Sequence, residues 1–359
     1  MEKFVGIDVH KESCTIAIVD GSGKRIRSQV VDTKAQIIIE AVKAVRRPVR
    51  VCIEEGTQAA WIHELLSPHV DELVVAQAIE SRGAKNDLRD AFALAESLRA
   101  GTLPRTIFKA PSQFSKLRAL AHSYESIVCD AARAKMRIGA IYRGRGVDTD
   151  ASLFDAGHRE WWLARLPPTL RPGAEVLHIE LEGIELARAK VTKELVAESH
   201  QHKISSVLET CPGLGPIRVG LLIPTVITPF RFRTKRQFWS YCGLGIVMRS
   251  SSDWVRSREG QWTRAPTMQP RGLSIAFNRT LKNIYKGAAM TVVQMKKLEL
   301  HGDYQRLLEK GIKPNLARLT IARRIAAISL ALWKTQEVYD PKKHMQQRST
   351  SVTSATSAS

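Results

Sequence analysis

Three strand-like runs stand at the start of the chain, in residues 3–32, which read KFVGIDVHKESCTIAIVDGSGKRIRSQVVD. Each run is rich in β-branched residues, and short polar turns separate the runs. The turn at residues 20–23, Asp-Gly-Ser-Gly, has the composition of a hairpin turn. The stretch therefore predicts an antiparallel meander of three strands.

The next residues alternate between helical and strand patterns. Apolar spacing predicts helices at 34–46 and 58–66, and apolar β-type runs predict strands at 49–55 and 72–77. A further helix is expected to begin near Asp87 and to run through AFALAESL. Because such alternation builds a sheet covered by helices, this order of elements predicts an α/β domain of the ribonuclease H-like class over residues 1–108.

Helical patterns dominate the remainder. A narrow apolar seam predicts a long helix over 111–143, and a second helical run follows at 175–196. We expect these helices to form a coiled-coil or linker region, 109–205, that packs as a hairpin within one chain or between chains, with self-association favoured. A mainly α-helical C-terminal domain is expected over 206–344, before a polar, disordered tail at 345–359.

The net charge points to a polyanionic partner. Lys and Arg number 55 against 35 acidic residues, which gives a formal charge of +20. No apolar run approaches the roughly 18 residues of a membrane span, and MEKFVGIDVH lacks the pattern of an export signal. The five cysteines form no Cys-x-x-Cys pair. We therefore expect a cytoplasmic protein that binds nucleic acid and does not enter a membrane.

Four acidic residues form the candidate catalytic centre. Asp8 lies in a predicted core strand, where a lone carboxylate is costly unless it is paired or binds metal. Glu54 ends another strand, and Asp87 and Asp90 share one face of a helix start. Oxygen ligands suit Mg²⁺ (or Mn²⁺), and since the histidines are scattered, carboxylates alone are expected to hold the metal. The structural alternatives are a solvated strand end for Glu54, a helix cap for Asp87 and a helix-dipole partner for Asp90.

The C-terminal half carries a candidate nucleic-acid surface. PGLGPI at 212–217 predicts a helix-hairpin-helix turn, in which Gly213 and Gly215 allow a phosphate to approach, although an ordinary helix break has the same composition. Three tryptophans, Trp239, Trp254 and Trp262, are interleaved with the cations of residues 231–286 and could stack on bases. These cations are Arg231, Arg233, Lys235, Arg236, Arg249, Arg256, Arg258, Arg264, Arg271, Arg279, Lys282 and Lys286.

Six short motifs together resemble one family. They are GIDVHK at 6–11, EEGTQ at 54–58, KNDLRDA at 85–91, PGLGPI at 212–217, YCGLG at 241–245 and RSSSD at 249–253. This set resembles the DEDD transposases of insertion sequences, which include the Piv-type DNA invertases. Two departures are Asn86, where many members have Thr, and PRGLSIAFN at 270–278, which replaces a K-x-G-N type run.

The resemblance implies both a fold and a reaction. It implies a Holliday-resolvase-like N-terminal domain, a coiled-coil middle and a C-terminal domain that supplies a nucleophilic serine. Counted from Gly243, the register favours Ser251 over its neighbours Ser250 and Ser252. It further implies a homo-oligomer, dimer to tetramer, that acts on double-stranded donor and target DNA under the guidance of a bridge RNA.

Other functions fit parts of the pattern. A structure-selective nuclease would keep the metal site but use water as the nucleophile, and a DNA invertase would need no RNA guide. A sugar kinase of the actin-like fold would explain the strand around Asp8 but neither KNDLRDA nor the excess charge. A scaffold without enzymatic activity would leave Asp8 unexplained.

Overall fold

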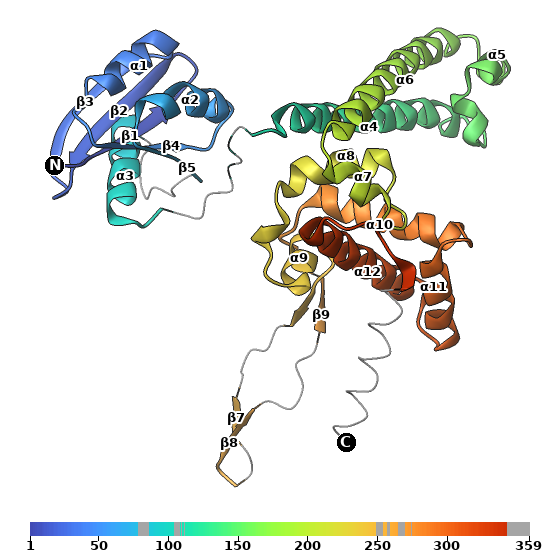
Figure 1. The fold of residues 1–359 in the computed structure, drawn as a ribbon. Helices are drawn as coiled ribbons and strands as arrows, with labels where there is room; N and C mark the ends of the chain where they lie inside the picture. The colour runs from blue at the N-terminus through green and yellow to red at the C-terminus, as the bar shows by residue number, and fades with distance from the viewer. Residues whose placement is uncertain are drawn as a thin grey trace. The chain divides into compact units, whose positions relative to one another are not determined.

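A computed structural model describes most of the chain as two compact units, residues 1–113 and 114–359 (Figure 1). The described residues are 1–77, 86–103, 108, 110, 112–248, 254–256, 259–264, 270–273 and 275–342. The tail expected to be disordered lies outside them.

The first unit is built on a five-stranded mixed sheet with the order β3-β2-β1-β4-β5. Strands β1, β2 and β3 pair antiparallel, as the three runs at the N-terminus predict, whereas β4 and β5 run parallel to β1. The expected α/β class of this domain is confirmed. The strands are β1 Lys3–Val9, β2 Ser13–Asp20, β3 Arg25–Asp32, β4 Val49–Glu54 and β5 Glu72–Ala76.

Helices cover both faces of this sheet (Figure 1). Helices α1 (Ala35–Lys43) and α2 (Ala59–Leu66) cover one face, where Ile7 packs in a core with Ile38 and Ile62. Helix α3 (Asp87–Ala100) covers the other face, where Phe4, Cys52 and Leu94 are buried. Successive side chains of a strand point to opposite faces, so β1 contributes odd-numbered residues to the first core and even-numbered residues to the second.

Gly6 determines how closely α3 approaches β1. A Cβ atom added at Gly6 would lie 1.9 Å from the carbonyl oxygen of Ala91 and 2.6 Å from the backbone nitrogen of Ala95. Only a residue without a side chain fits there. The backbone of α3 therefore lies directly on the strand, two residues before Asp8.

The second unit contains a long helical hairpin. Helices α4 (Ser115–Arg143) and α6 (Arg171–His200) pack against each other along their length. They run antiparallel, because their ion pairs join Lys116 to Glu198 and Arg137 to Glu180. The two expected helices are confirmed with slightly different ends, and their packing within one chain buries Leu117, Ala131 and Ile138 of the apolar seam. Self-association stays a prediction.

Short helices connect the two arms of the hairpin at its far end. They are η2 Ala151–Phe154, η3 Ala156–His158 and α5 Arg159–Leu163. Tyr142 and Trp162 meet there edge to face with ring centroids 5.6 Å apart. Together with Leu153 they form a small separate core.

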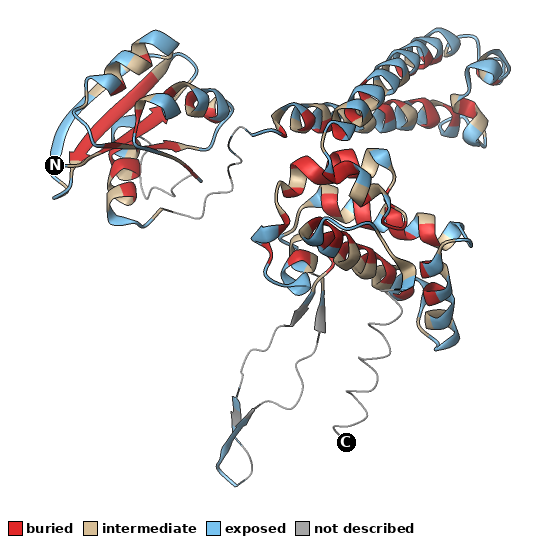
Figure 2. Cartoon of the chain, viewed as in Figure 1, coloured by how far each residue is buried: buried red, intermediate tan, exposed pale blue. Residues whose placement is uncertain are grey.

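The rest of the second unit is a helical bundle around the buried Tyr285 and Phe238. Figure 2 shows the buried residues concentrated where these helices meet. Two short strand pairs accompany the bundle, and the sequence patterns did not predict them. The elements are α7 Ile204–Glu209, α8 Pro216–Val226, η4 Pro229–Arg231, α9 Lys235–Tyr241, β6 Ile246–Met248, β7 Trp254–Arg256, β8 Trp262–Arg264, β9 Pro270–Leu273, α10 Arg279–Gln294, α11 Glu299–Glu309 and α12 Pro314–Thr335. None of the described helices is both long and apolar enough to span a bilayer.

Candidate active site

Asp8 is a buried carboxyl group near the end of β1, with 8% of the residue exposed. It pairs across the strands with Thr15 of β2, which is also buried. As an even-numbered residue of β1 it lies on the face of the sheet that α3 covers. An ionised group in this position needs compensating charge or coordination.

Asn86, and not Asp87, caps helix α3. The side-chain oxygen of Asn86 accepts hydrogen bonds from the backbone N–H groups of Leu88 (3.0 Å) and Arg89 (3.2 Å). Asp87 is the first residue of the helix proper. The alternative interpretation of Asp87 as a helix cap is therefore wrong. The departure of Asn86 from the family's threonine leaves capping intact, because both residue types are good caps.

Asp8 and Asp87 converge on His10. The Nε2 atom of His10 lies 3.3 Å from an Oδ atom of Asp8 and 3.3 Å from an Oδ atom of Asp87. One donor atom from each of the three side chains lies within 4.8 Å of the others. The contact between Gly6 and α3 explains this convergence, because Asp87 precedes Ala91 by one helical turn. We call these three residues the Asp-His-Asp cluster.

Glu54 and Asp90 do not join this cluster. Glu54 ends β4, and since Ile7 pairs with Ile53, it stands beside Asp8 on the neighbouring parallel strand. It shares the α3 face of the sheet with Cys52, two residues earlier. Asp90 lies in the first turn of α3 and is half-buried. Glu54 thus lies on the strand next to β1, and Asp90 lies on the helix that carries Asp87. Neither acid completes a group of three donors within 4.8 Å.

His10 is the residue that the sequence patterns missed. We expected carboxylates alone to surround a metal, whereas the structure places an imidazole between two of them. A signal was present, since His10 follows Asp8 by two positions and a β-strand places such residues on one face. His10 was not predicted because a histidine at this spacing is common without function.

The donors of the cluster fit a divalent cation. Two carboxylates and one imidazole are ligand types found with Mn²⁺ and similar ions, and carboxylates also suit Mg²⁺. The buried Nε2 atom of His10 makes no hydrogen bond to any residue that the structure describes, despite the two nearby oxygens. A buried nitrogen left in this way is costly. Coordination of an ion would use it.

An open polar hollow adjoins Asp87. Its volume is about 550 Å³. Its walls come from β2, β3 and the start of α3, and its lining residues are Ser13, Thr15, Ser28, Gln29, Val30, Asn86, Asp87 and Leu88. Most of these side chains are uncharged hydrogen-bonding groups. The hollow therefore leaves open polar space on the Asp87 side of the cluster.

The nearby cysteines Cys14 and Cys52 are poor candidate nucleophiles. Burial raises the pKa of the Cys14 thiol, and the neighbouring Asp8 raises it further, whereas a hydrogen bond between Cys14 and Thr33 lowers it. Burial also raises the pKa of Cys52 to about 12. Thiols with such pKa values remain protonated at neutral pH and are weak nucleophiles. The candidate catalytic groups of this unit are therefore its oxygen and imidazole groups.

The candidate nucleophile lies outside the described residues, together with part of the basic surface. Ser250, Ser251 and Ser252 belong to this group, as do Arg249 and Arg258, and the side chains of Arg264 and Arg271 are not described either. The position of the expected serine relative to the cluster therefore stays a prediction.

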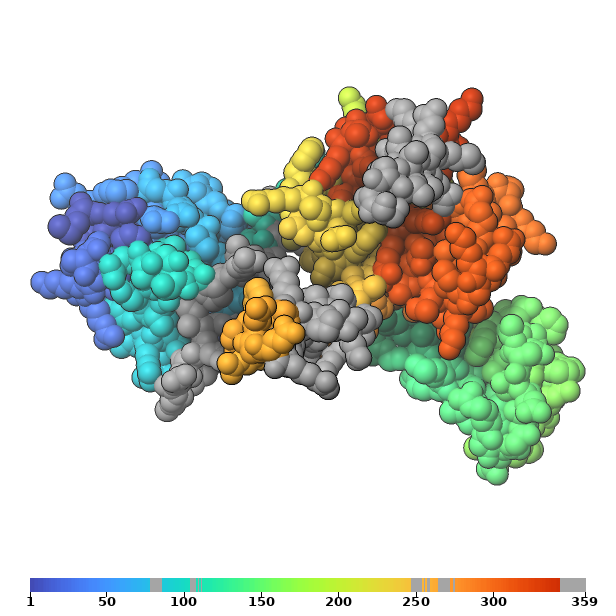
Figure 3. Space-filling model, turned by 90° about the horizontal axis from the view of Figure 1, so that it is seen from below, coloured from blue at the N-terminus to red at the C-terminus, as the bar shows by residue number. Residues whose placement is uncertain are grey.

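Exposed cations surround α9. Arg231, Arg233, Lys235 and Arg236 are all exposed, and the helix forms part of the surface of the second unit in Figure 3, where it is yellow. Arg231 stacks 5.4 Å from the ring centroid of Tyr241. A cluster of exposed cations within one short segment is suited to contacts with phosphates.

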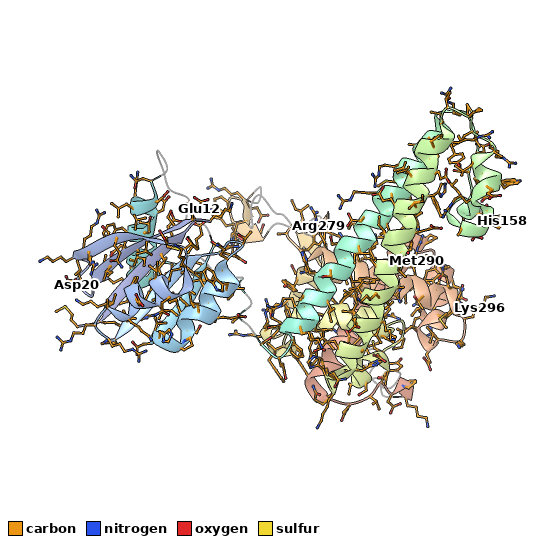
Figure 4. All side chains as sticks on the ribbon, turned by 90° about the horizontal axis from the view of Figure 1, so that it is seen from above. Glu12, Asp20, His158, Arg279, Met290 and Lys296 are labelled. Carbon is orange, nitrogen blue, oxygen red and sulfur yellow. The ribbon has the colours of Figure 1, made fainter. Side chains whose placement is uncertain are left out.

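Further cations lie at the start of α10 and on the β7–β8 pair. Arg279 begins α10, is exposed, and is labelled in Figure 4. Lys282 is half-buried, with its ammonium 3.9 Å from the centroid of the Phe277 ring. Arg256 lies on β7 and donates a hydrogen bond to the carbonyl of Gly260.

The three tryptophans divide into two kinds. Trp254 and Trp262, on β7 and β8, are 51% and 66% exposed, which leaves their rings accessible for stacking. Trp239 instead packs against the bundle core and donates a hydrogen bond of 2.8 Å to the carbonyl of Arg323. The interpretation of Trp239 as a base-stacking residue is therefore replaced by a structural role.

Gly213 and Gly215 also differ in their surroundings. Gly213 has a positive φ of 80°, and a Cβ atom there would lie 2.5 Å from the carbonyl oxygen of Ala288. Its lack of a side chain thus lets α10 approach closely. Gly215 precedes the first residue of α8 and borders a hollow of about 450 Å³ that Arg218 and Thr280 also line. Of the two, only Gly215 has open space beside it.

Two family models match the chain, one in each half. A model for IS110-type DEDD transposases, described as a transposase, matches residues 5–143. A model described as the transposase IS116/IS110/IS902 family matches residues 205–305. No curated protein matches the chain significantly. The first match spans all four expected acids, and the second spans the basic surface. The chain therefore belongs to the DEDD-type transposases of insertion sequences, enzymes that cleave and join DNA.

Proposed function

We propose that this transposase cleaves DNA at a divalent-metal site formed by Asp8, Glu54, Asp87 and Asp90, and that Ser251 is its covalent nucleophile. The observation that carries the proposal is the convergence of Asp8 and Asp87 from a strand and a helix far apart in sequence. The strand order β3-β2-β1-β4-β5 supports assignment of the first unit to the ribonuclease H-like class.

Mg²⁺ or Mn²⁺ held by these acids would supply charge stabilisation to the transferring phosphoryl group. Other features of the fold hold these acids in position. Asp8 is fixed by the central strand, Asp87 by the cap at Asn86, and Glu54 by its position beside Asp8. The polar hollow next to Asp87 offers room for a phosphodiester backbone.

A serine nucleophile would conserve the energy of the cleaved bond. The Ser251 oxygen would bond to phosphorus, the phosphorus–oxygen bond to the leaving DNA strand would break, and that strand would leave as a hydroxyl after taking a proton. The reverse attack by a DNA hydroxyl would release the serine and restore the phosphodiester without ATP. This chemistry explains how one protein can both cleave and join.

The remaining parts of the chain are assigned to recognition and assembly. We assign residues 1–108 to catalysis, 109–205 to linker helices, and 206–344 to a C-terminal domain with a helix-hairpin-helix at Gly213 and Gly215. The exposed cations Arg231, Arg233, Lys235, Arg236 and Arg279 support a surface for DNA and for a bridge RNA. A cytoplasmic homo-oligomer, dimer to tetramer, would bring donor and target DNA together.

Removal of one carboxylate tests the metal site. We expect Asp8→Asn and Asp87→Asn to reduce strand cleavage in Mg²⁺ by at least about a hundredfold, because each removes a metal ligand while retaining side-chain size. DNA binding and the unfolding midpoint should change little. Asp32→Asn, at an exposed acid on β3 paired with Lys34, is the matched control. Cleavage by Asp8→Asn at the wild-type rate would contradict the assignment.

A further inference from the structure

We propose that His10 is itself a ligand of the bound ion and makes the site prefer Mn²⁺ to Mg²⁺. This inference rests on the proposed metal site and adds a nitrogen donor to its four acids. The observation behind it is that His10 Nε2 lies 3.3 Å from oxygens of both Asp8 and Asp87.

The backbone around His10 is held in place at the end of β1. Its N–H donates to the carbonyl of Ser13 at 2.9 Å, and its own carbonyl accepts a hydrogen bond of 2.9 Å from the hydroxyl of Thr33. These contacts tie His10 to the first residue of β2 and to the residue that follows β3. The imidazole is therefore presented from a fixed backbone position and not from a free loop.

The side chain has the geometry of a ligand more than that of an ion-pair partner. One oxygen of Asp8 and one oxygen of Asp87 lie near Nε2, yet this buried nitrogen makes no hydrogen bond to a described residue. A protonated imidazole bridging two acids would be expected to donate along its N–H axis. A neutral imidazole would instead direct its lone pair at an ion held between the carboxylates.

A nitrogen ligand changes which cation is preferred. Mg²⁺ favours oxygen donors and retains several waters, whereas imidazole suits transition ions. Affinity for a mixed nitrogen and oxygen site rises from Mn²⁺ toward the later divalent ions. One imidazole added to a set of carboxylates therefore shifts the balance from Mg²⁺ toward Mn²⁺.

The test measures ion binding directly on the full-length protein without DNA. Mn²⁺ is titrated by electron paramagnetic resonance, Mg²⁺ by competition, and electron spin-echo modulation detects a directly bonded ¹⁴N nucleus. We expect wild type to show ¹⁴N modulation, and His10→Gln to lose it together with roughly tenfold of the Mn²⁺ affinity. Mg²⁺ affinity should change far less. His69→Gln, at another half-buried histidine of the same unit, is the control and should behave as wild type.

A second variant keeps the test informative if His10→Gln folds poorly. His10→Asp replaces the nitrogen donor with oxygen, so it should bind ion without ¹⁴N modulation and should prefer Mg²⁺ more than wild type does. Bound Mn²⁺ without ¹⁴N modulation in the wild type would overturn the inference.

Asp8→Asn separates the two proposals. If Asp8→Asn binds Mn²⁺ as wild type does, the metal site of the proposed function fails. If Asp8→Asn loses Mn²⁺ while His10→Gln keeps the wild-type affinity and preference, the metal site stands and the role of His10 fails.

Discussion

Gly6 shows how a single residue can position a candidate metal ligand that it does not contact. Because it has no side chain, the backbone of α3 rests on β1 at Ala91 and Ala95. One helical turn earlier, Asp87 reaches the level of Asp8 and His10. Within GIDVHK, Gly6 thus allows the close packing of α3 on β1, and Asp8, two residues later, supplies the carboxylate.

Replacement of Gly6 tests this coupling. Gly6→Ala should lower the free energy of unfolding by about 1–3 kcal/mol or more, because the added methyl group collides with helix backbone that cannot rotate away. It should also weaken ion binding by displacing Asp87. Urea unfolding and Mn²⁺ titration measure the two effects. Gly21→Ala, with no atom within 4 Å of its added methyl group, is the control. Equal stability of the two variants would contradict this account.

Sequence patterns located some site residues better than others. Asp8 could be predicted because a charge inside an apolar strand has few structural explanations. His10 and Asn86 could not, because a histidine at a strand end and an asparagine before a helix are common without function. The placement of His10 beside Asp87 depends on the distance between β1 and α3, and the close contact at Gly6 sets that distance.

At the scale of elements, helical periodicity predicted α4 and α6, although α6 leaves the apolar residues Val176, Ile179 and Leu186 exposed. The pairs β6–β9 and β7–β8 escaped prediction because their strands are too short for any alternation to stand out. The sequence also could not decide whether the two helices pair within one chain or between two chains, because an apolar seam does not specify its partner.

The α4–α6 hairpin should be sensitive to acid through His178. This histidine on α6 is 4% exposed, and burial, helped by the charge of Arg159, lowers its pKa below the ordinary value. The unfolded chain therefore takes up a proton near pH 6.5 that the folded chain takes up only at lower pH. Stability is full above the unfolded pKa and falls as the pH drops below it.

Thermal unfolding at several pH values measures this effect. We expect the unfolding midpoint to fall between pH 7.5 and pH 5, and to fall less in His178→Leu, which cannot titrate. His122→Gln, at an exposed histidine on α4, should retain the wild-type pH dependence. An unchanged pH dependence in His178→Leu would show that other groups are responsible.

At the scale of the whole molecule, the charge of +20 dominates. The exposed cations at α9 lie within one segment, so a bound polyanion would neutralise several of them at once. Binding to DNA should weaken steeply with salt because each neutralised phosphate releases counterions. The net charge indicated a nucleic-acid partner from the sequence alone, but it could not indicate which cations lie together on one surface.

A double variant measures the contribution of this segment. Arg233→Ala combined with Arg236→Ala should reduce the slope of log affinity against log salt by about 0.9 for each lost phosphate contact. Binding to duplexes of different sequence should weaken equally. Lys190→Ala combined with Lys193→Ala removes two exposed cations from α6 and serves as the control. A larger loss of slope in the control pair would place the main DNA surface on the hairpin.

The most direct test of the whole account is the covalent link between protein and DNA. A nicked duplex that loses its leaving strand prevents rejoining, so a serine ester should accumulate with wild type and survive denaturation. Ser251→Ala should form no adduct, whereas Ser250→Ala and Ser252→Ala should form it, and Asp8→Asn should form none with its serines intact. Strand exchange that continues with all three serines replaced by alanine, and without any adduct, would contradict a transposase that cleaves and joins DNA through serine.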